Sequence, residues 1–182
     1  TGRYSKAVLA VLSLLILCSG YSQFSGRPGK LHSHSIKAQW KRQNIVHYQN
    51  SRYGNICIVE NEGQYTYFQD GIAHLIVPIP DIPTVEEFVH LPLLAHPEPK
   101  NLLFLGGGAG GIIYEALKHP SIQTILYAEL DPLLLDLLRK FPTSLTESEL
   151  NDKRVRIQHG DGRLLLHKVR EKYDVIFLGI EE

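Results

Sequence analysis

A glycine-rich segment in the second half of the sequence is the first candidate for chemistry. Gly106–Gly111 follows the apolar run Asn101–Leu105, and an apolar helical pattern begins directly after it. Glycine tolerates positive φ and lets a ligand approach the backbone closely. A helix behind such a turn offers unpaired N–H groups to a nucleotide-like ligand. No Lys-Ser/Thr pair follows, which excludes a P-loop, and a tight turn without any ligand is the alternative.

Two carboxylates accompany this segment. Glu129 closes the run Thr124–Leu130 and lies 18 residues after Gly111, close to the spacing of an acid that accepts hydrogen bonds from ribose hydroxyls. Asp161 is expected beside the glycines, where it can accept a hydrogen bond from the exocyclic amine of a purine, although Asp and Gly are also ordinary turn residues. Together these features predict an adenosine-binding crevice, which NAD and S-adenosyl compounds both fit.

The elements that position these residues alternate between strand and helix from Lys100 onward. Mostly apolar strands alternating with helices predict an α/β fold with a parallel sheet covered on both faces, whose ligands bind at the carboxyl ends of the strands. The expected strands are Asn101–Leu105, Thr124–Leu130, Val155–His159 and Tyr173–Leu178, and the expected helices are Gly111–His119, Pro132–Phe141 and Gly162–Val169.

A different pattern precedes the alternating part. Ile45–Ile79 alternates β-forming residues with turns at Asn61–Gly63 and Asp70–Gly71, which predicts a small β-meander. A helix is expected over Val85–Ala95, although Pro92 limits it.

The N-terminal segment is basic and contains the apolar run Ala7–Cys18. A signal peptide, a last transmembrane helix and a buried helix are the three interpretations. Two basic residues precede the run and five lie between Arg27 and Arg42, and this charge bias favours a membrane helix whose following domain faces the cytoplasm. The rest of the chain, from Ser51, has twelve basic and nineteen acidic residues.

These patterns predict four segments. They are a transmembrane helix or signal segment (1–21), a basic linker (22–43), a small β-domain (44–83) and an incomplete Rossmann-like nucleoside-binding domain (84–182). The chain has no Met and stops just after an apolar strand, so both ends are expected to be cut from a longer protein. Cys18 and Cys57 are interpreted as small hydrophobes, and no metal is expected because no metal-ligand spacing is present.

The order of these pieces resembles the spermidine/spermine synthase (aminopropyltransferase) family. The matching stretches are SRYGNICIVE, QDG, VHLPLLAHPEPKNLLFLGGGAGG, LKHPSIQTILYAELDP, LNDKRVRIQHGDGRLLL and YDVIFL. The resemblance implies a Rossmann-like sheet of the S-adenosylmethionine-dependent methyltransferase type, C-terminally truncated here, behind the small β-meander. It implies decarboxylated S-adenosylmethionine or S-adenosylmethionine as donor, a polyamine or other amine as acceptor, no nucleic acid and a homodimer. A membrane leader is similar to bacterial proteins that fuse a transporter-like part to such a domain.

The resemblance also assigns residues. It places the donor among Gly106, Gly107, Gly108, Gly110, Glu129, Asp131, Asp161 and Gly162, and it places Glu86 at the amine substrate.

Three departures from the family pattern concern catalysis. Thr84 and Val85 replace the polar pair before Glu86, and Ala109 replaces an Asp in the glycine segment. Gly179 occupies the position of the catalytic Asp, so the catalytic residue is unknown. Aminopropyl transfer needs a neutral amine and therefore a base. Glu181 lies two residues further on, about 6–7 Å away along an extended chain.

Three functions follow. The first is a membrane-anchored, spermidine-synthase-like protein that transfers a group from an S-adenosyl-type donor. The second is a catalytically inactive binding or regulatory domain attached to a membrane transporter-like part. The third is an exported NAD-binding enzyme.

Overall fold

The computed structural model describes residues 2–24, 34–36, 38–41, 43–168 and 171–179. The chain divides into two compact units, Thr1–Gln43 and Asn44–Glu182. The first contains the helix α1 (Gly2–Phe24), and the second contains both sheets and the remaining helices named below. The prediction of a helix over the apolar N-terminal run is therefore confirmed.

The prediction that this helix crosses a membrane is wrong. Within the described ranges, no helix is both long enough and apolar enough to span a bilayer. The mostly apolar part of α1, Ala7–Cys18, is shorter than the about 20 apolar residues that a bilayer core requires. Polar residues and the charged Arg3 and Lys6 contribute to its remaining turns. The predicted membrane location, with the following domain facing the cytoplasm, is corrected for the same reason.

The second unit begins with a four-stranded antiparallel sheet. Its strands β1 (Ile45–Asn50), β2 (Asn55–Asn61), β3 (Gln64–Gln69) and β4 (Ile72–Val77) pair in chain order. Two-residue turns join the last three strands, with positive φ at Glu62-Gly63 and at Asp70-Gly71. Turns of this kind match the right-handed twist of the strands that they join. The predicted β-meander and both of its turns are confirmed.

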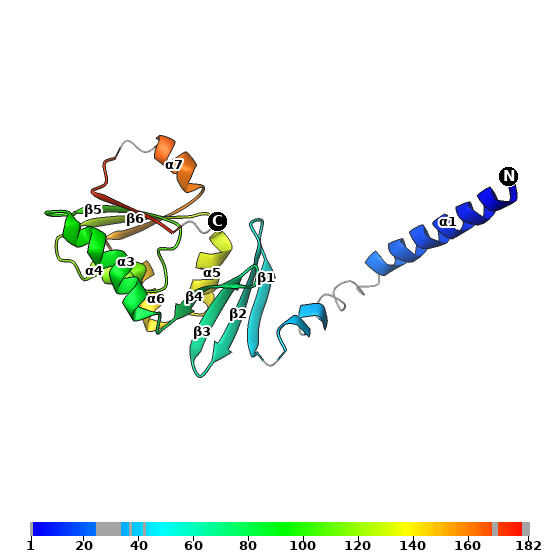
Figure 1. Ribbon diagram of the computed structural model, residues 1–182, viewed down its shortest axis with the longest axis horizontal. Coiled ribbons are helices and arrows are strands. Elements are labelled where there is room, and N and C mark those ends of the chain that lie inside the picture. The colour runs from blue at the N-terminus through cyan, green and yellow to red at the C-terminus, as the bar shows by residue number, and fades with distance from the viewer. Residues whose placement is uncertain (1, 25–33, 37, 42, 169–170, 180–182) are drawn as a thin grey trace. The chain divides into compact units, whose positions relative to one another are not determined.

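A parallel sheet follows, with the order β7-β6-β5-β8. Its strands are β5 (Asn101–Leu105), β6 (Thr124–Glu129), β7 (Val155–His159) and β8 (Val175–Leu178), and all three pairings are parallel. The chain moves outward from β5 through β6 to β7 and then returns to the other side of β5, where β8 lies. Figure 1 shows β5 and β6 side by side in this sheet. Such a reversal of strand order creates a crevice at the carboxyl ends of the strands. The predicted α/β fold with a parallel sheet is confirmed.

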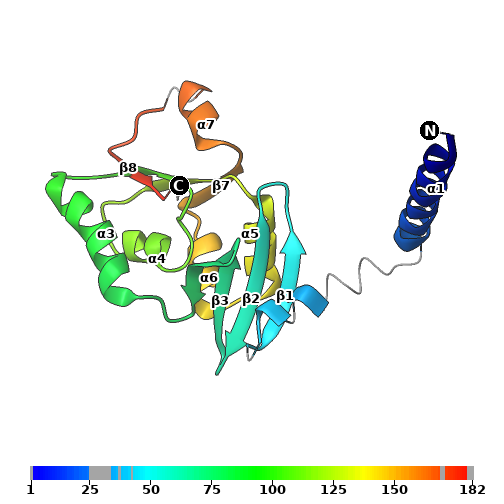
Figure 2. The same cartoon turned by 45° about the vertical axis from the view of Figure 1, so that its right-hand side comes forward.

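Among the described residues of the second unit, five helices accompany the two sheets: α3 (Ile82–Ala95), α4 (Ile112–Leu117), α5 (Pro132–Lys140), α6 (Ser144–Leu150) and α7 (Gly162–Lys168). α3 begins before the predicted Val85 and continues through Pro92. α6 was not predicted, although Thr143 and Thr146 form a capping box at its start. Figure 2 shows α3 and α4 on one side of the parallel sheet and α7 on the other.

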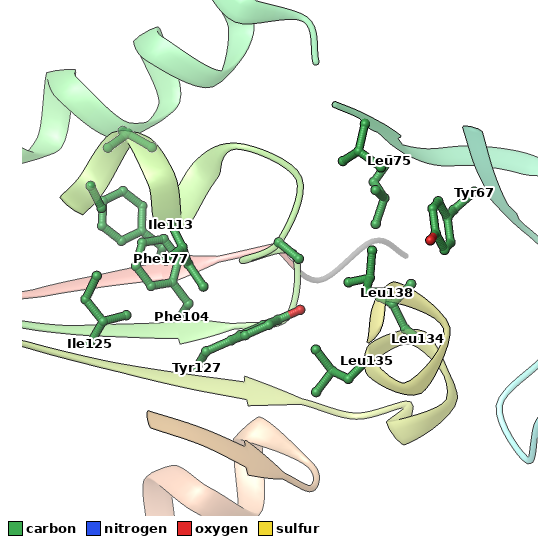
Figure 3. Packing of buried hydrophobic residues seen from close by; sticks show 14 of the residues in the cluster. Tyr67, Leu75, Phe104, Ile113, Ile125, Tyr127, Leu134, Leu135, Leu138 and Phe177 are labelled. Carbon is green, nitrogen blue, oxygen red and sulfur yellow. The ribbon is translucent and has the colours of Figure 1, made fainter. Parts of the chain in front are cut away.

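The two faces of the parallel sheet carry unequal cores. On the larger side Phe104 stacks on Phe177 with ring centroids 4.5 Å apart, and Phe88 of α3 packs against Phe177. Figure 3 shows this core continuing past Tyr127 to α5 and to Tyr67 and Leu75 of the meander. The other side is a small cluster around Leu165 of α7. Because the meander shares the main core, its strands hold a fixed position at the edge of the crevice.

Candidate functional site

A pocket of about 330 Å³ lies at the carboxyl ends of β5, β6 and β7. The predicted residues Gly106, Gly107, Glu129, Asp161 and Gly162 all line it, so the structure brings together the three strand ends that the sequence singled out. Gln69 and His74 of the meander complete one wall, and Gly179 lies at its β8 side. A larger hollow of about 890 Å³ lies near the beginnings of β5 and β6, the end of a parallel sheet where ligands are not expected.

The glycine loop, Gly106–Gly111, has a backbone that only glycine adopts without strain at four of its positions. Gly106, Gly107, Gly110 and Gly111 have φ values of 71°, 58°, 87° and 113°. Gly108 is required for another reason, because a Cβ there would lie 2.9 Å from the ring of Tyr127. Gly108 and Gly110 do not line the pocket beside Glu129. Gly108 is therefore explained by its packing against Tyr127, whereas Gly110 lies against Leu75 and borders the neighbouring pocket described below. Gly106 and Gly107 are the glycines of the loop that line the pocket beside Glu129.

Glu149 of α6 holds the glycine loop from behind, and the sequence analysis missed it. Its side chain is fully buried and accepts hydrogen bonds from the backbone N–H groups of Gly110, Gly111 and Tyr114 at 3.0, 2.7 and 3.2 Å. Burial raises the pKa of Glu149 to about 7, and the donated backbone hydrogen bonds lower it in part. These amides are occupied by the protein itself, so a ligand must use other groups of the loop.

Glu129 is a buried carboxylate at the end of β6, with two partners that fix its orientation. The hydroxyl of Tyr127 donates to its Oε2 at 2.6 Å, and the backbone N–H of Asp131 donates to its Oε1 at 3.1 Å. Burial and the neighbouring Glu129 raise the pKa of Tyr127 well above its usual value, so the phenol keeps its proton. A carboxylate can accept further hydrogen bonds, which suits the hydroxyls of a ribose.

Asp131 has a structural task in this chain. Its Oδ1 accepts a hydrogen bond from the backbone N–H of Leu133 at 3.0 Å, which caps the N-terminus of α5. Asp131 is buried, and it borders a different, smaller pocket beside β1 and α5. Asp131 is thus only two residues from Glu129 in the sequence, but it does not line the pocket that contains Glu129.

Asp161 lies at the end of β7 and lines the pocket together with Arg163. The guanidinium of Arg163 donates to both carboxylate oxygens, at 3.2 and 2.9 Å, and the backbone N–H of Arg163 donates at 2.9 Å. These hydrogen bonds hold the pKa of Asp161 below its usual value. Gly162 packs against Leu105, where a Cβ would lie 3.0 Å from the leucine side chain. Asp161 is therefore placed as predicted, with a cation already beside it.

Gly179 follows β8 and touches the glycine loop directly. A Cβ at Gly179 would lie 2.7 Å from both the carbonyl oxygen of Gly106 and the Cα of Gly107. A Cβ at Gly107 would in turn lie 2.9 Å from the Cα of Gly179. The two backbones pack without side chains between them. The position that the family pattern gives to a catalytic Asp therefore has no room for that side chain in this conformation.

A second pocket, of about 440 Å³, adjoins the first and shares His74, Gly107 and Gly179 with it. Its walls are mostly apolar and come from β4, α3 and the glycine loop, including Ala109. Asp81 is the one carboxylate among the described residues that line it, and its Oδ2 accepts a hydrogen bond from the hydroxyl of Thr84 at 2.8 Å. An elongated ligand can thus extend from one pocket into the other past Gly107.

Glu86 lies in neither pocket. Its side chain is exposed on α3 and belongs to a group with His90 and Glu115. Because α3 begins at Ile82, the residues that α3 directs at the second pocket are Thr84, Val85 and Phe88. The residue predicted to bind the amine is thus not brought together with the residues predicted to bind the donor.

Comparison with known proteins agrees with this geometry. Residues 83–180, more than half of the chain, match the model of the spermine/spermidine synthase domain. A polyamine aminopropyltransferase of Bacillus mycoides (strain KBAB4) is 30% identical over 149 residues, which cover 82% of this chain and 49% of that protein. The chain spans about half the length of the curated relatives that it matches.

Solved structures show the same likeness. A crystal structure of spermidine synthase from Thermotoga maritima has 29% identity and a TM-score of 0.67, covering 74% of this chain and 46% of that one. A spermidine synthase in complex with the transition-state analogue AdoDATO has 28% identity and a TM-score of 0.67, covering 76% and 47%. The fold, the strand-end pocket and these matches lead to one conclusion: the chain belongs to the spermine/spermidine synthase domain family.

Proposed function

We propose that this protein binds an S-adenosyl-type sulfonium donor, decarboxylated S-adenosylmethionine in particular, and takes part in aminopropyl transfer to a polyamine. One observation carries the proposal. The loop after β5, the buried Glu129 after β6 and Asp161 after β7 line one pocket, within the part of the chain that matches the family.

The pocket residues suggest how the donor is oriented. Glu129, held by Tyr127 and the backbone of Asp131, accepts hydrogen bonds from the ribose hydroxyls. Asp161 and Gly162 lie at the adenine end, and Gly106 and Gly107 let the sulfur approach the backbone closely. The side chain of the donor then extends past Gly107 into the second pocket, where the amine acceptor meets it.

The reaction itself places one demand on the protein. The lone pair of a neutral amine attacks the carbon next to the sulfonium, the new C–N bond forms, and the C–S bond breaks with its electrons going to sulfur. Methylthioadenosine leaves, and the amine loses a proton to a base. Amines of this kind are mostly protonated near neutral pH, so a carboxylate near the acceptor favours the reaction by taking the proton and attracting the remaining cationic groups.

Two sets of carboxylates are candidates for that base. Asp81 borders the second pocket. Glu181 and Glu182 follow Gly179 in sequence and lie outside the described residues. We propose that one of these three replaces the Asp of the family pattern, and single substitutions to Asn or Gln distinguish them by their effect on turnover.

Calorimetry on the full chain tests the proposal. Decarboxylated S-adenosylmethionine, S-adenosylmethionine, methylthioadenosine and NAD are titrated separately, and methylthioadenosine release is then followed with a diamine and with longer polyamines. We expect the decarboxylated donor to bind most tightly and to release methylthioadenosine only when an amine is present. Binding of NAD alone contradicts the proposal. Binding of the sulfonium donor without turnover of any amine would support the proposed ligand and contradict the proposed transfer reaction.

A further inference from the structure

Two pairs of residues with the same spacing face each other away from both pockets. Glu86 and His90 lie four residues apart on α3, and Glu115 and His119 have the same spacing on α4 and the turn after it. Residues four apart lie on one face of a helix. Because α3 packs against α4, the two Glu-x-x-x-His pairs meet at the contact between these helices.

The contacts within this cluster are short. Nε2 of His90 lies 3.3 Å from Oε2 of Glu115, and Nδ1 of His90 lies 2.8 Å from Nε2 of His119. One ligand atom from each of Glu86, His90 and Glu115 can be chosen so that all lie within 4.8 Å of one another. Three groups that commonly bind metals therefore converge from two helices.

One carboxylate oxygen of Glu115 is positioned to bind a cation. The residue is only 7% exposed. Its Oε1 pairs with Nζ of Lys118 at 2.6 Å. Its Oε2 is buried, accepts no hydrogen bond from the described residues, and lies 3.3 Å from Nε2 of His90. A buried carboxylate oxygen is costly unless a donor or a cation compensates it. For Oε2 of Glu115 that partner is either a proton on Nε2 of His90 or a metal ion held between the two residues.

The separation between His90 and Glu115 suits a metal ion. With metal–ligand bonds of about 2.0–2.1 Å, two ligands of a tetrahedral site lie about 3.3–3.4 Å apart. The observed 3.3 Å between Nε2 and Oε2 agrees with that edge length. His119 contacts the other ring nitrogen of His90 and can hold the tautomer whose Nε2 lone pair is free, as partners of metal-bound histidines do.

We propose that Glu86, His90 and Glu115 bind a divalent transition-metal ion that joins α3 to α4, with His119 orienting His90. Imidazole and carboxylate ligands together suit Zn²⁺ and its neighbours rather than Mg²⁺ or Ca²⁺. The site is separate from the two pockets and does not depend on the proposed aminopropyl transfer. It differs from the sequence-based expectation of no metal, which considered spacing along the chain and not the pairing of two helices.

Zn²⁺ titrated into the chelator-treated full chain tests the proposal by calorimetry at neutral pH. We expect one ion per chain in this site and a rise in the midpoint of thermal unfolding. Glu86→Gln, His90→Gln and Glu115→Gln should each weaken the binding at least about tenfold. Co²⁺ used as a spectroscopic probe should report a tetrahedral site that the same variants lose.

Controls separate this site from other histidines. The double variant His32→Ala/His34→Ala and the single variant His167→Ala should keep the Zn²⁺ affinity of this site. Glu86 is exposed, so Glu86→Gln is expected to fold normally and keeps the test valid if the buried variants do not fold. Absence of Zn²⁺ binding, binding that Glu86→Gln and His90→Gln both retain, or loss of binding in the His32/His34 variant overturns the proposal.

Discussion

The carboxyl ends of β6 and β8 lie on opposite sides of β5 and differ in what they present to the pocket. β6 ends in Glu129, a buried carboxylate whose orientation is set by Tyr127 and by the backbone of Asp131. β8 is followed by Gly179, whose backbone packs directly on the glycine loop. One strand end presents a carboxylate to the pocket, and the other shapes the pocket by having no side chain.

The contrast between the two strand ends is tested most strongly by placing a side chain at the end of β8. Gly179→Asp restores the residue type of the family pattern, but its Cβ would meet the backbone of Gly106 and Gly107 at 2.7 Å. We expect a loss of about 3 kcal/mol in the free energy of unfolding, because overpacking displaces the loop. Thermal and urea unfolding measure the stability, and calorimetry should show that donor binding is lost.

A matched variant makes this result specific. Apart from its chain neighbours and the backbone of its own helix, no described residue has a heavy atom within 4 Å of a Cβ at Gly20. Gly20→Asp should therefore leave both stability and donor affinity nearly unchanged. Donor affinity in Gly179→Asp equal to that of the unmodified chain would mean that the loop yields easily, and the contrast between β6 and β8 would then be lost.

Glu149 provides a second test, because it supports the glycine loop that both strand ends border. Its raised pKa, about 7 against an unfolded value of 4.5, means that the folded protein binds the proton more tightly. This contribution to stability is fully present below pH 4.5 and is lost as the pH rises through 7, by on the order of 3 kcal/mol.

Glu149→Gln cannot titrate, so the difference between the two proteins isolates this group. We expect the free energy of unfolding of the unmodified chain to fall more steeply between pH 4.5 and 7 than that of the variant. Urea unfolding at intervals across this range measures both curves. Parallel curves would show that Glu149 does not titrate in this range.

At the β6 end, Glu129→Ala should weaken donor binding about 100-fold, which corresponds to about 2.7 kcal/mol, because a buried charged acceptor of ribose hydroxyls is removed. Tyr127→Phe keeps the carboxylate but removes the hydroxyl that holds it, and it should weaken binding about fivefold. Calorimetry with the decarboxylated donor measures both. Equal affinity in Glu129→Ala would place the ribose elsewhere.

The smallest effect is expected at the end of β7. Arg163 is largely exposed and only orients Asp161, so Arg163→Ala should change donor affinity by about threefold or less. The change should shrink further at high salt, because exposed ion pairs are screened. A tenfold or larger loss would instead assign Arg163 a direct contact with the ligand.

Local patterns in the sequence were sufficient for much of the fold. Apolar runs and turn residues identified both sheets, because strand alternation and tight turns depend on neighbours in the chain. α6 was missed because it is short and its apolar pattern is weak, and the capping residues Thr143 and Thr146 were the available indication. The apolar run of α1 predicted a helix correctly, but its length and flanking charges did not suffice for a membrane span.

The sequence by itself determined the order of the strands and of the named helices other than α6. It also determined the glycine loop and the carboxylates Glu129 and Asp161 at successive strand ends. Parallel strands bring their carboxyl ends to one edge, so that part of the site follows from the order alone. Only the tertiary structure decided that Glu149 supports the loop, that Gly179 packs on Gly107, and that Glu86 faces His90 and Glu115 instead of the pocket. These contacts join residues far apart in the chain, and their formation depends on how the helices pack, which no local pattern records.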